Sequence, residues 1–385
     1  MAVAGMVYFL AAMVAACTFL ASRRSPLAPF APGVSILKSL KGNEPGMIEA
    51  FRTHCRQTYA GEYELLFGVS SLDDPAASTV KQLQQEFPSR SIQLVECPFR
   101  LGTNGKVSTL AQLEAYARYD FLLINDSDIT VSPRYLERVM ALFAPEKDRK
   151  TRNQVGLVTA LYRGRAQASL ASRLEALGIA TDFQAGVLLS RMIEGGLSYG
   201  LGSTLAIRRE ALKEIGGLLP LVDHLADDYE LGARVARAGF RVALSAEVVE
   251  TSIPTHSWSS FIDHQLRWAR TVRDASRWGY RGLIFTHGLG WAMLNVVVSG
   301  LSPMSFWLLG LSFFLRLSLA MVVGAQVLGD HQVLPGLWLL PFRDLVAMGV
   351  WIAGFAGNTV VWRGVRFVLK DGKLLPFKPA SHSPD

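Results

Sequence analysis

Long apolar stretches occupy both ends of the 385-residue chain, with a mixed region between them. The first covers residues 1–22, and about 20 apolar residues are enough for a helix to cross a bilayer. Three more follow toward the C-terminal end: Leu283–Gly300, Met304–Leu328 and Leu334–Trp362. The pattern predicts an N-terminal transmembrane anchor over 1–22, a soluble domain over 33–280 and a membrane region over 283–362 with two to three membrane helices.

Basic residues stand directly after the first and the last apolar stretch. They are Arg23, Arg24, Arg363, Arg366, Lys370 and Lys373. Because arginine and lysine gather on the cytoplasmic side of membrane proteins, we expect the soluble domain and the basic tail over 363–385 to be cytoplasmic. No basic residues precede the first stretch, unlike in a signal peptide, so we expect it to remain uncleaved.

This orientation requires an even number of C-terminal crossings. Leu283–Gly300, which contains His287 and several glycines, is the stretch that we expect not to cross. Arg316 lies in the middle of the following stretch, where a charge is costly unless it faces protein or reaches the interface.

Strand and helix patterns alternate through the soluble domain. Short β-type runs are found at Gly33–Leu40, Glu64–Val69, Ser91–Val95 and Phe121–Ile124. Helical patterns lie between them at Met47–Gln57, Ser78–Glu86 and Lys106–Arg118. This order predicts an α/β fold with a mostly parallel sheet and helices on both faces. Ligands of such sheets bind at the carboxyl ends of the strands, so the residues after each strand are the informative ones.

Composition supports a membrane protein and argues against a nucleic-acid partner. Half of the residues are hydrophobic and the mean hydropathy is +0.24, while charged residues make up only 18%, below the roughly 25% of soluble domains. The net charge of +7 comes with basic residues that flank the apolar stretches, and no basic run is interleaved with aromatics. Three cysteines without metal-ligand spacing, at positions 17, 55 and 97, argue against a disulfide framework and suit a reducing compartment.

Two carboxylates follow the predicted strand Phe121–Ile124. In extended backbone, Asp126 and Asp128 would point to the same side, just beyond the strand end. Two hard oxygen ligands there suit Mg²⁺ or Mn²⁺ shared with substrate phosphates. The structural alternative is a solvated turn, for which aspartate is equally suited.

A second acidic pair begins a predicted helix. Asp227 and Asp228 precede Tyr229–Ala238, and acidic residues at a helix start are ordinary capping residues. The functional alternative is that one carboxylate is the general base for an acceptor hydroxyl. Lys106 stands beside another helix start, where it could contact a phosphate or simply lie in a surface turn.

A third group lies on one face of the predicted helix Ser257–Trp278. His264, Arg267 and Trp268 are spaced at i, i+3 and i+4. Arginine and histidine there could stabilise a diphosphate, while tryptophan offers a flat face to a sugar. An amphipathic helix on the membrane surface explains the same pattern without chemistry.

Each of these patterns is common, but the order and spacing of the set are specific. The set is Asn104–Val107, Asn125–Asp128, Ala226–Tyr229 and His264–Trp268, ahead of C-terminal membrane segments. It resembles the ceramide glucosyltransferase family of GT-A (Rossmann-like) glycosyltransferases, as do Gly33–Gly42 and Leu72–Ala76. The resemblance covers about residues 1–375. Gly156–Arg165, with His264–Arg270 and Trp278–Tyr280, looks most like bacterial members, including hopanoid biosynthesis-associated glycosyltransferases, which implies a bacterial inner membrane.

The resemblance implies a role for each matched position. Asp126 and Asp128 would bind the metal and the donor diphosphate. Asp228 would be the catalytic base, with Asp227 beside it. Arg267 and Trp268 would belong to the (Q/R)xxRW signature that closes over donor and acceptor.

The nucleotide side of the site follows from the same resemblance, with three departures. Asp73 or Asp74 would lie near the nucleotide, and Lys106 would contact the donor. The first position of the (Q/R)xxRW signature is His264 instead of glutamine or arginine. Ser70 and Ser71 stand where many relatives carry an acidic residue for the base, and a histidine of the animal enzymes falls near Thr159.

These residues together lead to a functional hypothesis. We expect an inverting, non-processive transfer of glucose or N-acetylglucosamine from a UDP-sugar to the hydroxyl of a membrane lipid, assisted by Mg²⁺ or Mn²⁺. Ceramide and a hopanoid polyol (bacteriohopanepolyol) are both open as acceptors. A processive polysaccharide synthase or an inactive membrane scaffold would also carry much of this pattern.

Overall fold

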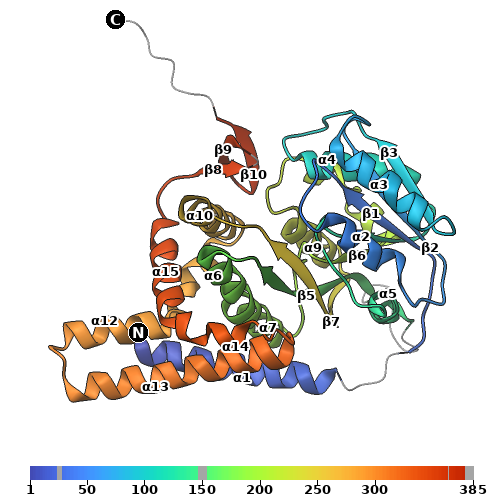
Figure 1. Cartoon of the computed structure of the whole chain (residues 1–385). Helices are drawn as coiled ribbons and strands as arrows, with labels where there is room; N and C mark the ends of the chain where they lie inside the picture. The colour runs from blue at the N-terminus through green and yellow to red at the C-terminus, as the bar shows by residue number, and fades with distance from the viewer. Residues whose placement is uncertain (24–27, 146–153, 363, 378–385) are drawn as a thin grey trace, which may run out of the picture.

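The computed structural model describes residues 1–23, 28–145, 154–362 and 364–377 (Figure 1). A seven-stranded sheet lies at the centre of the soluble domain, in the order β3-β2-β1-β4-β6-β5-β7. The strands are β1 (Val34–Ser39), β2 (Tyr63–Val69), β3 (Ser91–Glu96), β4 (Phe121–Ile124), β5 (Val155–Ala166), β6 (Leu205–Arg208) and β7 (Arg241–Ile253). The first four are parallel to one another, and β6 runs antiparallel to both β4 and β5. The predicted α/β fold with a mostly parallel sheet is confirmed.

The sequence explains where the early helices begin. They are α2 (Met47–Cys55), α3 (Pro75–Glu86) and α4 (Gly105–Leu113). Asp74 caps α3 by accepting the Ala76 N–H, and a proline occupies the first turn. Asn104 caps α4 by accepting the Val107 N–H at 3.2 Å. Because both caps follow strands, they fix where each helix starts at the carboxyl edge of the sheet.

The rest of the soluble domain is mainly helical. Its elements are α5 (Tyr135–Met140), α6 (Leu170–Gly178), the π-helix η4 (Ile179–Phe183), α7 (Gln184–Glu194), α8 (Arg209–Glu214), α9 (Asp227–Arg237), α10 (Trp258–Ala275) and α11 (Arg277–Gly282). The predicted helix over Ser257–Trp278 is thus divided, because the helix ends at Ala275 and restarts at Arg277.

Apolar helices begin the chain and lie again ahead of its last strands. They are α1 (Ala2–Ser22), α12 (Gly288–Val298), α13 (Pro303–Ala320) continued by η7 (Met321–Val327), and α14 (Val333–Gly336) with η8 (Leu337–Leu339) leading into α15 (Leu340–Ala353). Within the described residues, three helices are long and apolar enough to cross a membrane: Ala2–Ser22, Pro303–Val327 and Val333–Ala353. This agrees with one N-terminal and two C-terminal membrane helices. At about 1.5 Å per residue, α12 is too short to span a bilayer, as expected for Leu283–Gly300.

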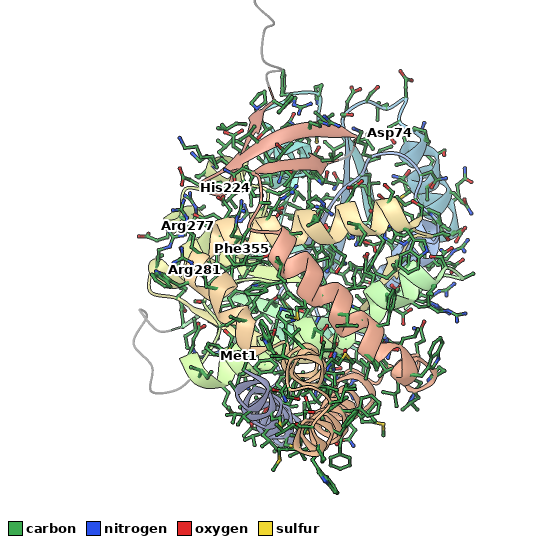
Figure 2. The ribbon with its side chains drawn as sticks, turned by 90° about the vertical axis from the view of Figure 1, so that its left-hand side faces the viewer. Met1, Asp74, His224, Arg277, Arg281 and Phe355 are labelled. Atoms are coloured by element: carbon green, nitrogen blue, oxygen red, sulfur yellow. The ribbon has the colours of Figure 1, made fainter. Side chains whose placement is uncertain are left out.

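The apolar helices pack against one another and against the soluble domain. In Figure 1, α1 and α13 run side by side below the sheet, and Figure 2 views them nearly end-on. Helix α1 also packs along α7. A Cβ on Gly5 would lie 2.1 Å from the Cα of Gly288, so only glycine permits this approach of α1 to α12. At the other end of α1, Arg23 donates to the carbonyl of Val327 at 2.7 Å.

A buried charge cluster joins the candidate membrane helices to the soluble domain. Arg316 of α13 donates to both carboxylate oxygens of Asp344 in α15, at 2.9 and 3.0 Å. It also contacts Asp182 and Thr181 of η4. Its side chain is only 1% exposed. The arginine that is costly in a membrane segment therefore faces protein and is paired.

A small antiparallel sheet follows the last apolar helix, which differs from the prediction. Its strands are β8 (Thr359–Trp362), β9 (Val365–Lys370) and β10 (Lys373–Pro376). Residues 359–362 lay within the predicted membrane region, but the last long apolar helix ends at Ala353. Phe367, Leu369 and Leu374 pack against Leu225 of the soluble domain, and the Leu225 N–H donates to the carbonyl of Gly372 at 3.0 Å. The apolar character of residues 359–362 thus reflects a small core of their own.

Candidate active site

A lysine joins two of the predicted carboxylates at the carboxyl edge of the sheet. Lys106, in the first turn of α4, lies 2.7 Å from Asp126 Oδ1 and 3.3 Å from Asp227 Oδ2. Burial opposes the charge on Lys106, but the two carboxylates outweigh it and raise its pKa. The Asp126 side chain is 43% exposed, so this end of the cluster is open to a ligand. The structure brings together three residues from separate parts of the sequence.

A fully buried lysine, absent from the residues predicted from sequence, supports the loop that carries Asp126. Lys38, in the middle of β1, donates from Nζ to the carbonyl of Asp126 at 2.9 Å. Burial lowers the pKa of Lys38 to about 7, although Asp126 and Asp128 act in the opposite direction. A lysine in a buried strand that contains no other charged residue was the signal that could have identified it.

Asp128 is held differently from Asp126. The prediction assumed extended backbone after β4, but the structure has a turn at Ser127 and Asp128. The Asp128 carboxylate accepts hydrogen bonds from the Thr251 hydroxyl and from the Ser252 N–H on β7. Burial, with the nearby charge of Asp126, raises the pKa of Asp128. Two carboxylates that repel each other in this way would be stabilised by a shared cation.

Asp228 is fixed by backbone groups at the start of α9. Its Oδ2 accepts the Gly202 N–H at 2.7 Å, and its Oδ1 accepts the Tyr229 N–H at 2.8 Å. Burial and the charge of Asp227 raise the pKa of Asp228 to about 6, against the opposing effect of Lys106. A carboxylate with a pKa close to neutral is suited to accept a proton at physiological pH.

Helix α9 approaches this loop closely. A Cβ on Gly232 would lie 2.2 Å from the backbone nitrogen of Gly200. The glycine therefore lets α9 pack directly on the loop that binds Asp228.

The three predicted residues of α10 have different surroundings. Trp268 packs on Phe183, with ring centroids 6.2 Å apart, and on apolar residues of α6 and β7. The Arg267 guanidinium makes no hydrogen bond or ion pair with any residue that the structure describes, so it is available to an anion. His264 contacts Glu175 of α6 through Nδ1 at 3.0 Å.

The other arginines of α10 have a structural role. Arg270 donates to the carbonyl of Thr359 at 2.6 Å. Arg273 donates to the carbonyls of Gly354 and Gly357. These two arginines hold the start of the C-terminal sheet and the segment that leads into it, so the positive charge of α10 is largely used in docking rather than at the site.

The two candidates near the nucleotide differ in availability. The Asp74 carboxylate accepts both the Ala76 N–H and the Gly42 N–H at 2.9 Å, which occupies it as a helix cap and a link to the loop after β1. Asp73 is exposed at the same edge. In Figure 2, Asp74 lies in the upper part of the molecule and Met1 in the lower part. His224 lies beside the C-terminal strands, where its backbone forms an antiparallel β-bridge with Lys373.

The fold and these residues define a GT-A-type glycosyltransferase. Residues 1–375 match glycosyl transferase family 21, and the chain belongs to this family. It is 27% identical over 360 residues to ceramide glucosyltransferase 3 of Caenorhabditis elegans, covering 90% of this chain and 75% of that protein. Ceramide glucosyltransferase 1 of the same organism is 23% identical over 359 residues, covering 89% and 73%.

Solved structures bear on the fold. The chain is similar to the mannosyltransferase PcManGT from Pyrobaculum calidifontis, solved in complex with GDP-Man and Mn²⁺. The TM-score is 0.53 at 18% identity, and the match covers 92% of this chain and 96% of that one. This similarity supports the GT-A fold.

Proposed function

We propose that this enzyme transfers a hexose from a UDP-sugar to the hydroxyl of a membrane lipid, with ceramide as the first acceptor to test. The observation that carries the proposal is the convergence of Asp126, Lys106 and Asp227, with Asp228 following Asp227 in sequence. This arrangement combines a site for an anionic donor with a base of suitable pKa. The ceramide glucosyltransferases among the relatives favour ceramide over a hopanoid, and glucose over N-acetylglucosamine.

The donor diphosphate would lie between the β4 edge and α10. Lys106 and Arg267 would face its negative charge from opposite sides, and Asp73 would lie toward the nucleotide. Asp126 and Asp128 fit a divalent cation, Mg²⁺ or Mn²⁺, because their carboxylates repel each other and each retains an oxygen for coordination. Such an ion would neutralise the charge of the departing nucleoside diphosphate.

The transfer itself would use Asp228 as the general base. The acceptor hydroxyl attacks the anomeric carbon as its proton passes to the Asp228 carboxylate, and the bond to the diphosphate breaks on the opposite side. A single displacement of this kind inverts the configuration at that carbon. The backbone N–H groups of Gly202 and Tyr229 hold the carboxylate in place throughout. Trp268 would stack on a sugar or an acceptor ring.

The acceptor would reach this site from the side of the candidate membrane helices. A cleft of about 380 Å³ lies there between the end of β5, α6 and α14. Its walls are mainly apolar, including Leu177, Val333 and Trp338. We propose that hydrocarbon chains enter here, with the soluble domain on the cytoplasmic face where UDP-sugars are available.

The test is a transfer assay with the full chain in detergent or proteoliposomes. UDP-glucose and UDP-N-acetylglucosamine are each offered with ceramide or with a hopanoid polyol, and products are identified by mass spectrometry. We expect hexosylceramide from UDP-glucose. A product that contains no lipid would contradict the proposal, and a polymer of sugar would support a processive synthase instead.

Substitution of Asp228 tests the assigned base. We expect Asp228→Asn to lower kcat by about 10²–10⁴-fold, because the amide cannot accept the proton. Glu230→Gln is a matched control from the same helix turn, since Glu230 pairs with Arg234 at 2.7 Å instead of facing Lys106. Near-wild-type turnover by folded Asp228→Asn protein would exclude this residue as the base.

A further inference from the structure

A second group of metal-ligating side chains lies outside the carboxylate site. Glu175 of α6, His256 in the loop after β7 and His264 of α10 each offer one atom, and these atoms lie within 4.8 Å of one another. Glu175 Oε2 is 3.0 Å from His264 Nδ1 and 3.3 Å from His256 Nε2. We propose that this triad binds a zinc-like divalent ion that fixes α10 relative to α6. The proposal does not depend on the transfer reaction.

The distances suit a tetrahedral ion. Zinc–ligand bonds of about 2.0–2.2 Å place neighbouring ligand atoms about 3.3 Å apart in a tetrahedron. The two separations from Glu175 Oε2 are close to this value, and the two histidine nitrogens lie within 4.8 Å of each other. Three protein ligands leave a fourth position for water or a substrate atom.

The burial of the triad also indicates a missing partner. Glu175 is only 2% exposed and the His256 side chain only 11%. His256 Nε2 is buried and makes no hydrogen bond with the described residues, although it lies close to the Glu175 carboxylate. Buried nitrogen atoms are normally satisfied, and coordination would satisfy this one.

Neighbouring residues already orient the ligands. His256 Nδ1 lies 3.3 Å from the Ser260 hydroxyl, which leaves Nε2 directed at the triad. The backbone N–H of His256 donates to the Ser172 hydroxyl at 3.1 Å, and Ser172 lies on α6 close to Glu175. Hydrogen bonds to the second ring nitrogen are a regular feature of histidine ligands in metal sites.

The ligand types select the ion. Two imidazoles and one carboxylate favour zinc or a similar transition metal, whereas Mg²⁺ and Ca²⁺ take oxygen ligands. The triad would therefore hold a different ion from the one proposed for Asp126 and Asp128. Because His264 lies one turn before Arg267 and Trp268, an ion at the triad would hold this part of α10 beside α6.

The test measures zinc content and cobalt spectra of the full chain in detergent, purified without a nickel step. The protein is treated with a chelator, loaded with Zn²⁺ or Co²⁺, freed of unbound metal and measured by mass spectrometry and absorption. We expect about one zinc per chain and a tetrahedral cobalt spectrum. His256→Ala and His264→Gln should lose both signals, and Ser260→Ala should bind about 10–100-fold more weakly.

Two controls separate this site from the others. Both control variants should keep the zinc. Asp126→Asn affects only the carboxylate site, and His331→Ala removes an exposed histidine outside the triad. Zinc should also raise Tm in the wild type but not in His264→Gln. Wild-type protein without zinc, or equal zinc in wild type and both triad variants, would overturn the proposal. If the triad variants do not fold, X-ray absorption of the wild type decides, since all-oxygen ligation excludes the triad.

Discussion

Asp227 and Asp228 are neighbours in sequence but have different surroundings. Asp227 faces Lys106, which compensates its charge, while Asp228 turns to the backbone N–H groups of Gly202 and Tyr229. The unequal environments place one carboxylate beside a cation and raise the pKa of the other. Pairs of carboxylates divided in this way commonly take different roles in catalysis.

The raised pKa of Asp228 predicts an acidic limit to activity. Only the ionised carboxylate can accept the proton, so kcat should fall as the pH drops below about 6 and level off above it. In Lys106→Met, a cation that lowers this pKa is absent, so the limit should move to higher pH. The measurement is the pH profile of kcat at saturating donor. If kcat of the wild type falls only near pH 4, the ordinary aspartate pKa, burial does not raise the pKa of the base.

At the scale of elements, a single close approach sets the position of the base. Helix α9 rests on the loop before β6 through Gly232 and Gly200. Gly232→Ala should push α9 outward and lower kcat by about 10²-fold, because misplacement by about 1 Å has effects of this size. Gly196→Ala is the control, since its Cβ would meet no atom within 4 Å. Steady-state kinetics compares the two, and equal kcat values would mean that the contact does not position Asp228.

The sequence specified some elements better than others. Parallel strands have local signals in their apolar runs, and β2, which precedes the helix cap Asp74, was predicted nearly to the residue. The run Thr359–Trp362 was wrongly placed in the membrane region, because a short apolar segment suits a membrane helix and a strand equally until its partner Leu225 is known. Likewise, no local pattern shows that Arg270 donates to the carbonyl of Thr359, and only the docked C-terminal sheet reveals this contact.

Residues from distant elements form contacts that no local pattern contains. Glu175 and His264 are 89 positions apart, and their contact depends on how α6 packs against α10. The pairing of Arg316 with Asp344 is similar, since Arg316 alone looked like a costly charge in an apolar stretch.

The Arg316 pairing predicts a coupled stability effect. Arg316→Leu leaves Asp344 buried without its cation, which should cost about 3–5 kcal/mol. Adding Asp344→Leu removes the unpaired charge and should recover a large part of that loss. Thermal unfolding of the single and double variants in detergent measures the coupling. Purely additive effects of the two substitutions would contradict a direct interaction.

At the scale of the whole molecule, the apolar helices and the soluble domain form one packed unit. Helix α1 has one face against α7, α12 and α13, and its opposite face exposes Val3, Val7, Leu10 and Val14. An exposed apolar face of this length is expected to contact lipid. Because α1 also packs along the soluble domain, the lipid-facing side of the molecule lies next to the domain instead of beyond a linker.

Cys17 provides a native probe of that face. It is exposed near the end of α1, whereas Cys55 and Cys97 are buried, and burial raises their pKa values to about 12 and about 11. In proteoliposomes, we expect Cys17 to resist a water-soluble maleimide until the protein is unfolded in SDS, because lipid covers this side of α1 and keeps the thiol from ionising. Cys17→Ser is the control, since any labelling of this variant comes from the two buried thiols. Rapid labelling of the wild type by the water-soluble reagent would mean that α1 faces water, and the lipid-facing arrangement of the helices would have to be abandoned.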